Sequence, residues 1–208
     1  MKYSNKIFIY PTDTVWGLGC GIYSESGVEK IVKLKKIEKA RPFSVLFYEL
    51  EKSKEFFSFP SYMNDSWLKN FFSLQSALAL PLSIRKKEIP YWITAGSTHV
   101  VVRILSLPSI KEIIDEVQAP IITTSLNFSG NDPICDRNEA LLFHQRHMPK
   151  SRFIDKETSA SAMASTIVAW KDDEIKFWRI GEKAKEIHRL CLDILPKDKV
   201  HLEVNICK

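Results

Sequence analysis

The chain has 208 residues, a net charge of +5, a hydrophobic fraction of 45% and a charged fraction of 26%, values that exclude a disordered or fibrous protein. No segment approaches the roughly 20 consecutive apolar residues of a membrane-spanning helix, and the scattered cysteines have the spacing of neither a zinc ribbon nor a disulfide framework. The sequence therefore predicts a cytoplasmic protein without a membrane partner, and its mildly basic balance suits anionic ligands or RNA.

The first predicted element is a strand at residues 7–10, an unbroken apolar run typical of a strand that is covered on both faces. A proline ends this run, and Thr12, Asp13 and Thr14 follow before the glycines of residues 17–21. We expect those glycines to form a turn, through positive φ angles or close backbone approach, and the strand to deliver the polar residues to a cleft. The simpler interpretation is an ordinary turn whose hydroxyl groups cap local amides.

The rest of the chain is predicted to alternate between helices and strands. The predicted helices span residues 24–40, 52–59, 64–72, 107–118, 137–147 and 181–195. The predicted strands span residues 43–48, 77–84, 99–105, 119–125, 164–170 and 174–180. Pro81 suggests that its strand lies at an edge of the sheet or is bent. This alternation, with hairpin-like pairs mixed in, predicts an α/β fold with a mixed parallel and antiparallel sheet, and the length favours one domain over residues 1–208.

Polar side chains also follow a later predicted strand, in the segment "TTSLNFSG". Thr124, Ser125 and Asn127 would lie just beyond the end of that strand, where ligands commonly bind in α/β proteins, and could contact phosphate or carboxylate oxygens. A polar loop that caps its own backbone is the alternative. The same arrangement, a strand followed by hydroxyls, occurs at Thr12, and Ser165 lies in another predicted strand. This recurrence favours a shared binding site.

Basic residues are the second group of candidates. Lys35 and Arg41 lie across a predicted helix end and the entry to a strand, although a solvated helix face is the simpler interpretation for most lysines there. Arg103 lies among apolar strand residues, where an arginine is costly unless it meets a carboxylate or an anionic ligand. The sequence contains no Walker motif and no nucleophile elbow. A site built of threonine, serine, asparagine, lysine and arginine, with no obvious nucleophile, suits a reaction in which the protein positions phosphates and the substrates supply the nucleophile.

Five segments in this order, "YPTDTVWGLGCG", "RPFSVLF", "HVVVRIL", "PIITTSLNFSG" and "STIVAW", resemble the YrdC-like family of threonylcarbamoyl-AMP synthases in its short, single-domain form. The resemblance covers about residues 7–182, which would form the core of the domain, with a C-terminal helix and tail at 183–208. It implies a twisted mixed sheet flanked by helices around a concave basic cleft. It also implies an enzyme of the nucleotidyltransferase class.

Members of that family condense L-threonine, bicarbonate and ATP into threonylcarbamoyl-adenylate and release pyrophosphate. A partner transferase then modifies adenosine 37 of tRNA. The resemblance therefore implies ATP with Mg2+ as a substrate and no tightly bound metal ligated by the protein. It implies tRNA and the threonylcarbamoyl transferase machinery as partners.

The resemblance also implies roles for individual residues. The residues implied to bind threonine are Thr12, Thr14, Arg103 and Ser165. The residues implied to bind the nucleotide are Lys35, Arg41, Thr124, Ser125, Asn127 and Arg179. Of these, Lys35 and Arg41 are expected to be the catalytic cations.

The chain departs from the family pattern at three places. The ungapped alignment puts Lys35 at the lysine of a K-x-R motif, Ile37 at its arginine and Arg41 at the strand entry. A shifted alignment would pair Lys39 with Arg41, but it leaves too few residues before the strand. "SLQSALALP" replaces the family's P-G-P-x-T segment, and Trp16 replaces the usual tyrosine. These departures are compatible with weakened activity or a changed substrate.

Two other functions remain as alternatives. The first is a non-catalytic module that uses the same basic cleft to bind double-stranded RNA or tRNA by shape and phosphate contacts. The second is an adenylate-forming relative that accepts another carbamate. Threonine-dependent release of pyrophosphate distinguishes the synthase from the RNA-binding module.

Overall fold

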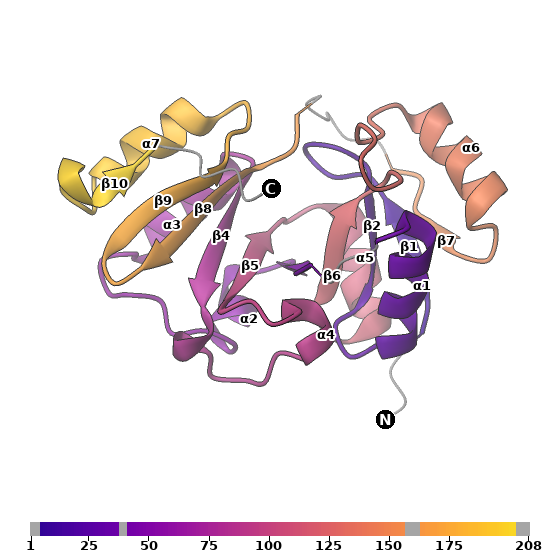
Figure 1. Ribbon diagram of the computed structural model, residues 1–208, viewed down its shortest axis with the longest axis horizontal. Helices are drawn as coiled ribbons and strands as arrows, with labels where there is room; N and C mark the ends of the chain where they lie inside the picture. The colour runs from indigo at the N-terminus through magenta and orange to yellow at the C-terminus, as the bar shows by residue number, and fades with distance from the viewer. Residues whose placement is uncertain (1–4, 38–40, 157–162, 203–208) are drawn as a thin grey trace.

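A mixed sheet forms the centre of the computed structural model, which describes residues 5–37, 41–156 and 163–202 (Figure 1). Within these residues the strands are β1 (Ile7–Tyr10), β2 (Gly17–Gly21), β3 (Ser44–Phe47), β4 (Ser76–Pro81), β5 (His99–Ile104), β6 (Ile121–Ser125), β7 (Arg152–Phe153), β8 (Thr166–Lys171), β9 (Glu174–Arg179) and β10 (Val200–His201). Their order across the sheet is β10-β9-β8-β4-β5-β3-β6-β2-β1-β7. Lys39 and the tail at 203–208 lie outside the described residues.

The pairing of the strands confirms the mixed sheet expected from the sequence. β3 runs parallel to β5 and antiparallel to β6, while β4 runs parallel to β8 and antiparallel to β5. β1 and β2 are antiparallel neighbours, and so are β8 and β9. The order in the sheet therefore brings together segments that are far apart in the chain, such as β8 beside β4 and β6 beside β2.

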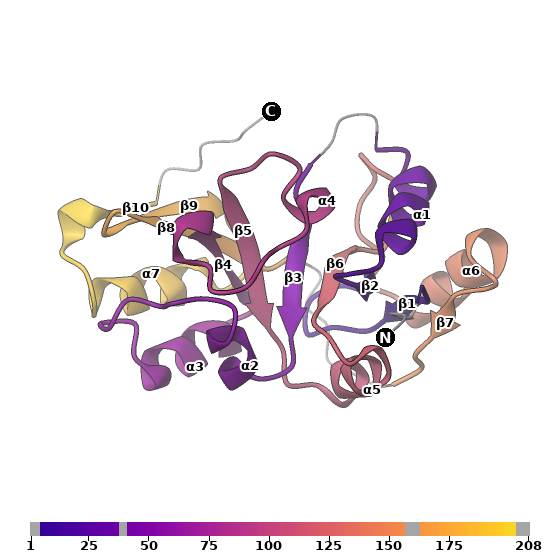
Figure 2. The same ribbon diagram turned by 90° about the horizontal axis from the view of Figure 1, so that it is seen from below.

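Helices cover the sheet with their apolar side chains. They are α1 (Glu25–Lys35), α2 (Leu50–Lys54), α3 (Asp65–Ser73), α4 (Tyr91–Thr94), α5 (Pro108–Val117), α6 (Arg137–His147) and α7 (Ala184–Leu192). None of the helices in the described ranges has both the length and the apolar character needed to cross a membrane. Figure 2 shows α2, α3 and α7 on one side of the strands. In α3, the residues Trp67, Leu68, Phe71 and Phe72 recur at helical spacing and are buried, so this helix packs on the core.

The two faces of the sheet are covered differently. Val45 and Val102 belong to the large core that includes buried residues of α1, α3 and α7. Because successive side chains of a strand point to opposite faces, their neighbours Ser44, Val101 and Thr123, which are paired across β3, β5 and β6, face the other way. On this second face, α5 packs against residues of β1, β3 and β6. The part of the second face over β4, β5 and β8 forms the floor of a pocket.

The glycines at 17–21 form strand β2, so the prediction of a turn there was wrong. β2 pairs with β1 on one side and β6 on the other, and none of its glycines has a positive φ angle. The close backbone approach expected of these glycines is confirmed, because neighbouring groups leave no room for a side chain. A Cβ on Gly19 would lie 2.2 Å from the carbonyl oxygen of Ile122, and one on Gly17 would lie 2.6 Å from the ring of Tyr10.

Other elements also differ from the sequence-based expectation. β4 lies between β8 and β5 inside the sheet, so of the two alternatives inferred from Pro81, an edge position or a bend, the edge position was wrong. Pro81 is the last residue of β4, where its missing amide hydrogen hardly disturbs the strand pairing. The helix expected at 52–59 ends at Lys54, because Phe57 forms a β-bridge with Arg85 instead of a further helical turn. The elements α4, β7 and β10 were not predicted, since each is too short to show a periodic pattern.

Asn64 is expected to stabilise α3 from its N-cap position, since its side-chain oxygen accepts a hydrogen bond from the amide of Trp67 at 3.0 Å. Asn64→Ala should lower the free energy of unfolding by about 1 kcal/mol, because the first helical turn loses this acceptor. Asn70→Ala is the matched control, because Asn70 is exposed inside the same helix and alanine there should be neutral or slightly stabilising. Urea denaturation measures both variants, and equal midpoints would contradict the capping role.

Candidate active site

A pocket of about 360 Å3 lies over the second face of the sheet. Its walls come from the turn after β1, the entry to β3, the strands β4 and β5, the end of β6, and the β8–β9 pair. The predicted site residues that line this pocket are Thr12, Thr14, Arg41, Arg103, Thr124, Ser125, Ser165 and Arg179. Lys35 and Asn127 do not line it, but both contact Ser125. The fold therefore brings the predicted residues to one place from separate strand ends.

The turn after β1 holds its two threonines in buried positions. Thr12 donates a hydrogen bond to the carbonyl of Val15 at 2.6 Å and accepts from the amides of Thr14 and Val15 at 3.1 and 3.2 Å. Its hydroxyl oxygen also lies 3.1 Å from that of Thr14. Thr12 therefore fixes the turn, as in the simpler interpretation of the sequence, and at the same time positions Thr14 at the pocket.

Arg103 connects this turn to the centre of the sheet. It is 7% exposed, and its guanidinium forms an ion pair with the carboxylate of Asp13. A second guanidinium nitrogen donates to the hydroxyl of Thr14 at 3.3 Å. The sequence predicted that a buried arginine at this position meets a carboxylate or a ligand, and Asp13 supplies the carboxylate. Asp13 was not among the predicted site residues, although it is the one acidic residue of "PTDT" and the motif could have indicated it.

Arg179 and Ser165 form the opposite wall of the pocket. The Nε of Arg179 donates to the carbonyl of Ser165 at 2.7 Å, and its Nη2 donates to the Ser165 hydroxyl at 2.9 Å. Loss of solvent around the guanidinium, followed by the nearby charge of Arg103, lowers the pKa of Arg179 to about 10. Arg179 and Arg103 therefore both present guanidinium groups to the pocket.

Lys35 is fully buried and holds the loop that follows β6. Its ammonium group donates to the carbonyls of Ser125 and Asn127 at 2.6 and 3.0 Å, and to the side-chain oxygen of Asn127 at 2.5 Å. That oxygen also accepts from the Ser125 hydroxyl at 2.8 Å. Burial, followed by the charge of Arg41, lowers the pKa of Lys35 to about 8. An ammonium group has three hydrogens, and the three acceptors in this loop can use all of them. Lys35 therefore positions the loop, and its catalytic role stays a prediction.

The departures from the family pattern have visible structural counterparts. Ile37 packs against the large core, so the position of the motif's arginine provides no charge to the pocket. Arg41 lines the pocket at the entry to β3. Trp16 lines it as well, but its ring is buried against Phe153 with centroids 5.0 Å apart. In the segment that replaces P-G-P-x-T, Gln75 donates to the backbone carbonyl of Asp13 at 2.8 Å, which sequence reasoning did not anticipate.

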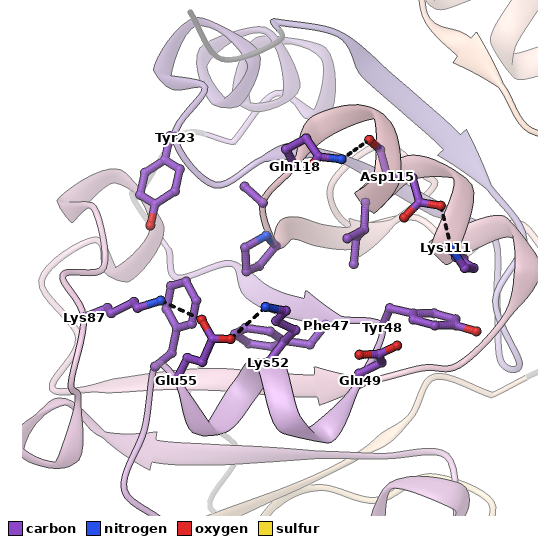
Figure 3. Close-up of a pocket in the computed structure, with 14 residues that line it drawn as sticks. Tyr23, Phe47, Tyr48, Glu49, Lys52, Glu55, Lys87, Lys111, Asp115 and Gln118 are labelled. Atoms are coloured by element: carbon purple, nitrogen blue, oxygen red, sulfur yellow. Dashed lines mark hydrogen bonds and ion pairs between the residues drawn. The ribbon is translucent and has the colours of Figure 1, made fainter. Parts of the chain in front are cut away.

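A second pocket, of about 400 Å3, lies at the end of β3 between α2 and α5 (Figure 3). Its lysines pair with its own carboxylates, as Figure 3 shows. Lys52 and Lys87 both contact Glu55 at 2.8 Å, and Lys111 contacts Asp115 at 2.7 Å. In contrast, no acidic side chain belongs to the described residues that line the first pocket. The first pocket is therefore the better site for a ligand with several negative charges.

The first pocket offers guanidinium groups and hydroxyls that can hold carboxylate and phosphate oxygens. Among residues 5–37, 41–156 and 163–202, no group of three or more histidine, cysteine, aspartate or glutamate side chains is arranged to hold a metal ion. The arrangement suits a reaction between bound substrates, in which the protein supplies position and positive charge.

Known proteins with a similar sequence belong to the family that the sequence motifs resemble. The family profile Sua5_yciO_yrdC, described as "Telomere recombination", matches residues 3–181. The threonylcarbamoyl-AMP synthase of Pseudoalteromonas atlantica is 28% identical over 141 residues, which are 65% of this chain and 72% of that protein.

Two solved structures resemble the whole fold. P. abyssi Sua5, complexed with L-threonine, matches 95% of this chain with a TM-score of 0.77 and 22% identity, and this chain covers 56% of that longer one. E. coli YciO matches 86% of this chain and 84% of its own length, with a TM-score of 0.70 and 19% identity. The fold is thus an α/β fold of the Sua5 and YciO type. The match to the family profile shows that the chain belongs to the Sua5/YciO/YrdC family, which confirms the resemblance found in the sequence.

Lys35 is expected to make the stability depend on pH. Because its pKa falls from 10.5 to about 8 on folding, the unfolded chain binds more protons between these values, and the free energy of unfolding should rise with pH across this window. Lys35→Met removes the titrating group. The stability difference between wild type and this variant should therefore grow in favour of the wild type between about pH 7 and about pH 10.

Urea denaturation at several pH values measures this effect. Lys33→Met is the matched control, because Lys33 is an exposed lysine of the same helix, and its difference from wild type should stay constant with pH. If the difference in free energy of unfolding between wild type and Lys35→Met stays constant or shrinks as the pH rises, the lowered pKa of Lys35 is not the cause of the pH dependence.

Proposed function

We propose that this chain is a threonylcarbamoyl-AMP synthase, which joins L-threonine, bicarbonate and ATP to form threonylcarbamoyl-adenylate and pyrophosphate. The observation that carries the proposal is the convergence of Arg41, Arg103 and Arg179 with threonine and serine hydroxyls on one pocket. Three guanidiniums suit substrates that bring a carboxylate and a triphosphate. The name of the P. atlantica relative and the L-threonine bound to P. abyssi Sua5 support the same assignment.

Threonine is assigned to the end of the pocket near the turn after β1. Arg103 would bind its carboxylate, since the contacts with Asp13 and Thr14 already hold the guanidinium toward this end. Thr14 offers its hydroxyl next to Arg103, and Thr12 keeps the turn in place. Ser165 offers a hydroxyl from the opposite wall, where Arg179 fixes it.

The phosphates of ATP are assigned to the end of the pocket near β6. Thr124 and Ser125 line this end together with Arg41, and these groups would contact phosphate oxygens. Lys35 and Asn127 would act through the loop that they hold. Mg2+ would enter with ATP, because the described lining of the pocket supplies no carboxylate that could bind the metal by itself.

The substrates themselves carry the reacting groups. The nitrogen of threonine forms a bond to the carbon of bicarbonate, whose C–OH bond breaks, and this hydroxyl leaves as water with a proton from the amine. An oxygen of the resulting carbamate then attacks the α-phosphate of ATP. The bond from this phosphorus to the bridging oxygen of the β-phosphate breaks, and pyrophosphate leaves. Arg41 and Arg179 would stabilise the negative charge on the phosphate oxygens, which lowers the barrier without a covalent enzyme intermediate, and Ser165 holds the guanidinium of Arg179 in place for this role.

The product is an activated carbamoyl group that must be consumed by a transferase. We therefore include tRNA, with its adenosine 37, and a threonylcarbamoyl transferase as partners in the proposal. A cytoplasmic location and a single domain over residues 1–208 belong to the same proposal.

The test combines turnover with binding. Purified protein with ATP, Mg2+ and bicarbonate should release pyrophosphate only when L-threonine is added. Arg103→Ala should weaken threonine binding roughly 10- to 100-fold in calorimetry, because a charged contact to the carboxylate is lost, and should leave ATP binding largely intact. Asn127→Ala should weaken ATP binding instead, because Lys35 and Ser125 lose an acceptor that orders their loop.

Arg85→Ala is the control for removal of a positive charge, since Arg85 lies outside the pocket and its ion pair with Glu88 is exposed. This variant should retain both affinities and the turnover. Pyrophosphate release that does not respond to threonine would contradict the proposal. Salt-sensitive RNA binding without any turnover would instead support the non-catalytic RNA-binding module.

A further inference from the structure

Trp178 is an aromatic residue of the pocket that keeps a large exposed surface. It is 37% exposed, whereas Trp16 and Phe43, which also line the pocket, are each 5% exposed. Its ring meets His99 at an interplanar angle of 67° with centroids 5.2 Å apart. A contact of this kind covers at most one face of the indole ring. Within the described lining of the pocket, Trp178 is therefore the aromatic side chain that can offer a ring face to a ligand.

A β-bulge brings Trp178 to the pocket together with its neighbour Arg179. In the pairing of β8 with β9, Val168 lies opposite Phe177 and Ile167 lies opposite Arg179, so Trp178 is an extra residue. Adjacent residues of a regular strand point to opposite faces of the sheet. The bulge changes this alternation, and both Trp178 and Arg179 line the pocket. An aromatic ring and a guanidinium thus stand side by side at one wall.

The floor beside Trp178 differs chemically from the rest of the pocket. Ala77, Val101 and Ile167 line it with apolar side chains from β4, β5 and β8. Carboxylate and phosphate groups would lose hydration there without gaining a partner. Of the groups that the proposed substrates carry, the adenine base is the one that is both planar and largely apolar on its faces.

We propose that Trp178 is the stacking platform for the adenine base of the nucleotide. This assignment rests on the proposed function. With the phosphates held by Arg41, Ser125 and Arg179, the base would lie over the apolar floor with one face on the indole. Stacking between a base and an aromatic side chain requires no hydrogen-bond pattern, and its loss typically weakens binding about tenfold or more.

Calorimetry with ATP and with inorganic tripolyphosphate, which lacks the base, tests the platform. Trp178→Ala and Trp178→Leu should each weaken ATP binding about tenfold or more and leave tripolyphosphate binding unchanged, because only the base contact is lost. Trp178→Phe should stay within about threefold of wild type, since it keeps an aromatic face. Tyr91→Ala is the matched control, because Tyr91 is an aromatic residue that is 74% exposed outside the pocket, and it should change neither affinity.

Equal losses for ATP and tripolyphosphate would overturn the proposal, since Trp178 would then only support Arg179. Unchanged ATP binding in Trp178→Leu would overturn it too. A tRNA-binding measurement on the same variant separates the remaining case: a loss confined to tRNA binding would overturn the proposal and place Trp178 on an RNA surface. If Trp178→Ala does not fold, the comparison of Trp178→Leu with Trp178→Phe decides the question. Failure of the proposed function is recognised separately, because the wild type would then show no threonine-dependent release of pyrophosphate.

Discussion

The buried ion pair between Arg103 and Asp13 is the interaction on which the site depends. Arg103 belongs to β5, inside the sheet, where an unpaired charge would be costly. Asp13 belongs to the turn after β1, and no direct pairing joins β1 to β5 in the sheet. The pair therefore fixes the turn, with Thr12 and Thr14, against the floor of the pocket. Arg103 also lines the pocket, so the pair is in contact with the space that a ligand would occupy.

A second buried cation organises the other end of the same pocket. Lys35 lies at the end of α1, and its ammonium group holds the loop after β6 by three acceptors. The charges that face the pocket directly are those of Arg41, Arg103 and Arg179. The lysine and the arginines thus differ in position: the buried ammonium group arranges a loop, and the guanidiniums line the pocket. In the pocket between α2 and α5, the lysines pair with carboxylates that line the same pocket. Asp13, the partner of Arg103, does not belong to the lining of the first pocket.

Much of the fold and of the site could be predicted from local patterns. Continuous apolar runs gave β1, β3 and β5, and helical spacing gave α1, α3 and α5, because burial repeats with the period of each element. The need of Arg103 for a partner followed from its apolar neighbours alone. The strand β2 was missed because its glycines serve close packing against Tyr10 and Ile122, which the sequence does not place beside them. The role of Gln75 was missed for the same reason.

The sequence by itself determined most of the longer elements, the polar residues at the strand ends and, through its motifs, the family. The tertiary structure alone decided which of those residues share a pocket and which support it from behind. It placed Lys35 beneath the loop, packed Ile37 against the core and brought both Trp178 and Arg179 to the pocket through a bulge. The physical reason is that strand order and register are set by contacts between segments far apart in the chain. The spacing of residues along the chain carries no direct record of those contacts.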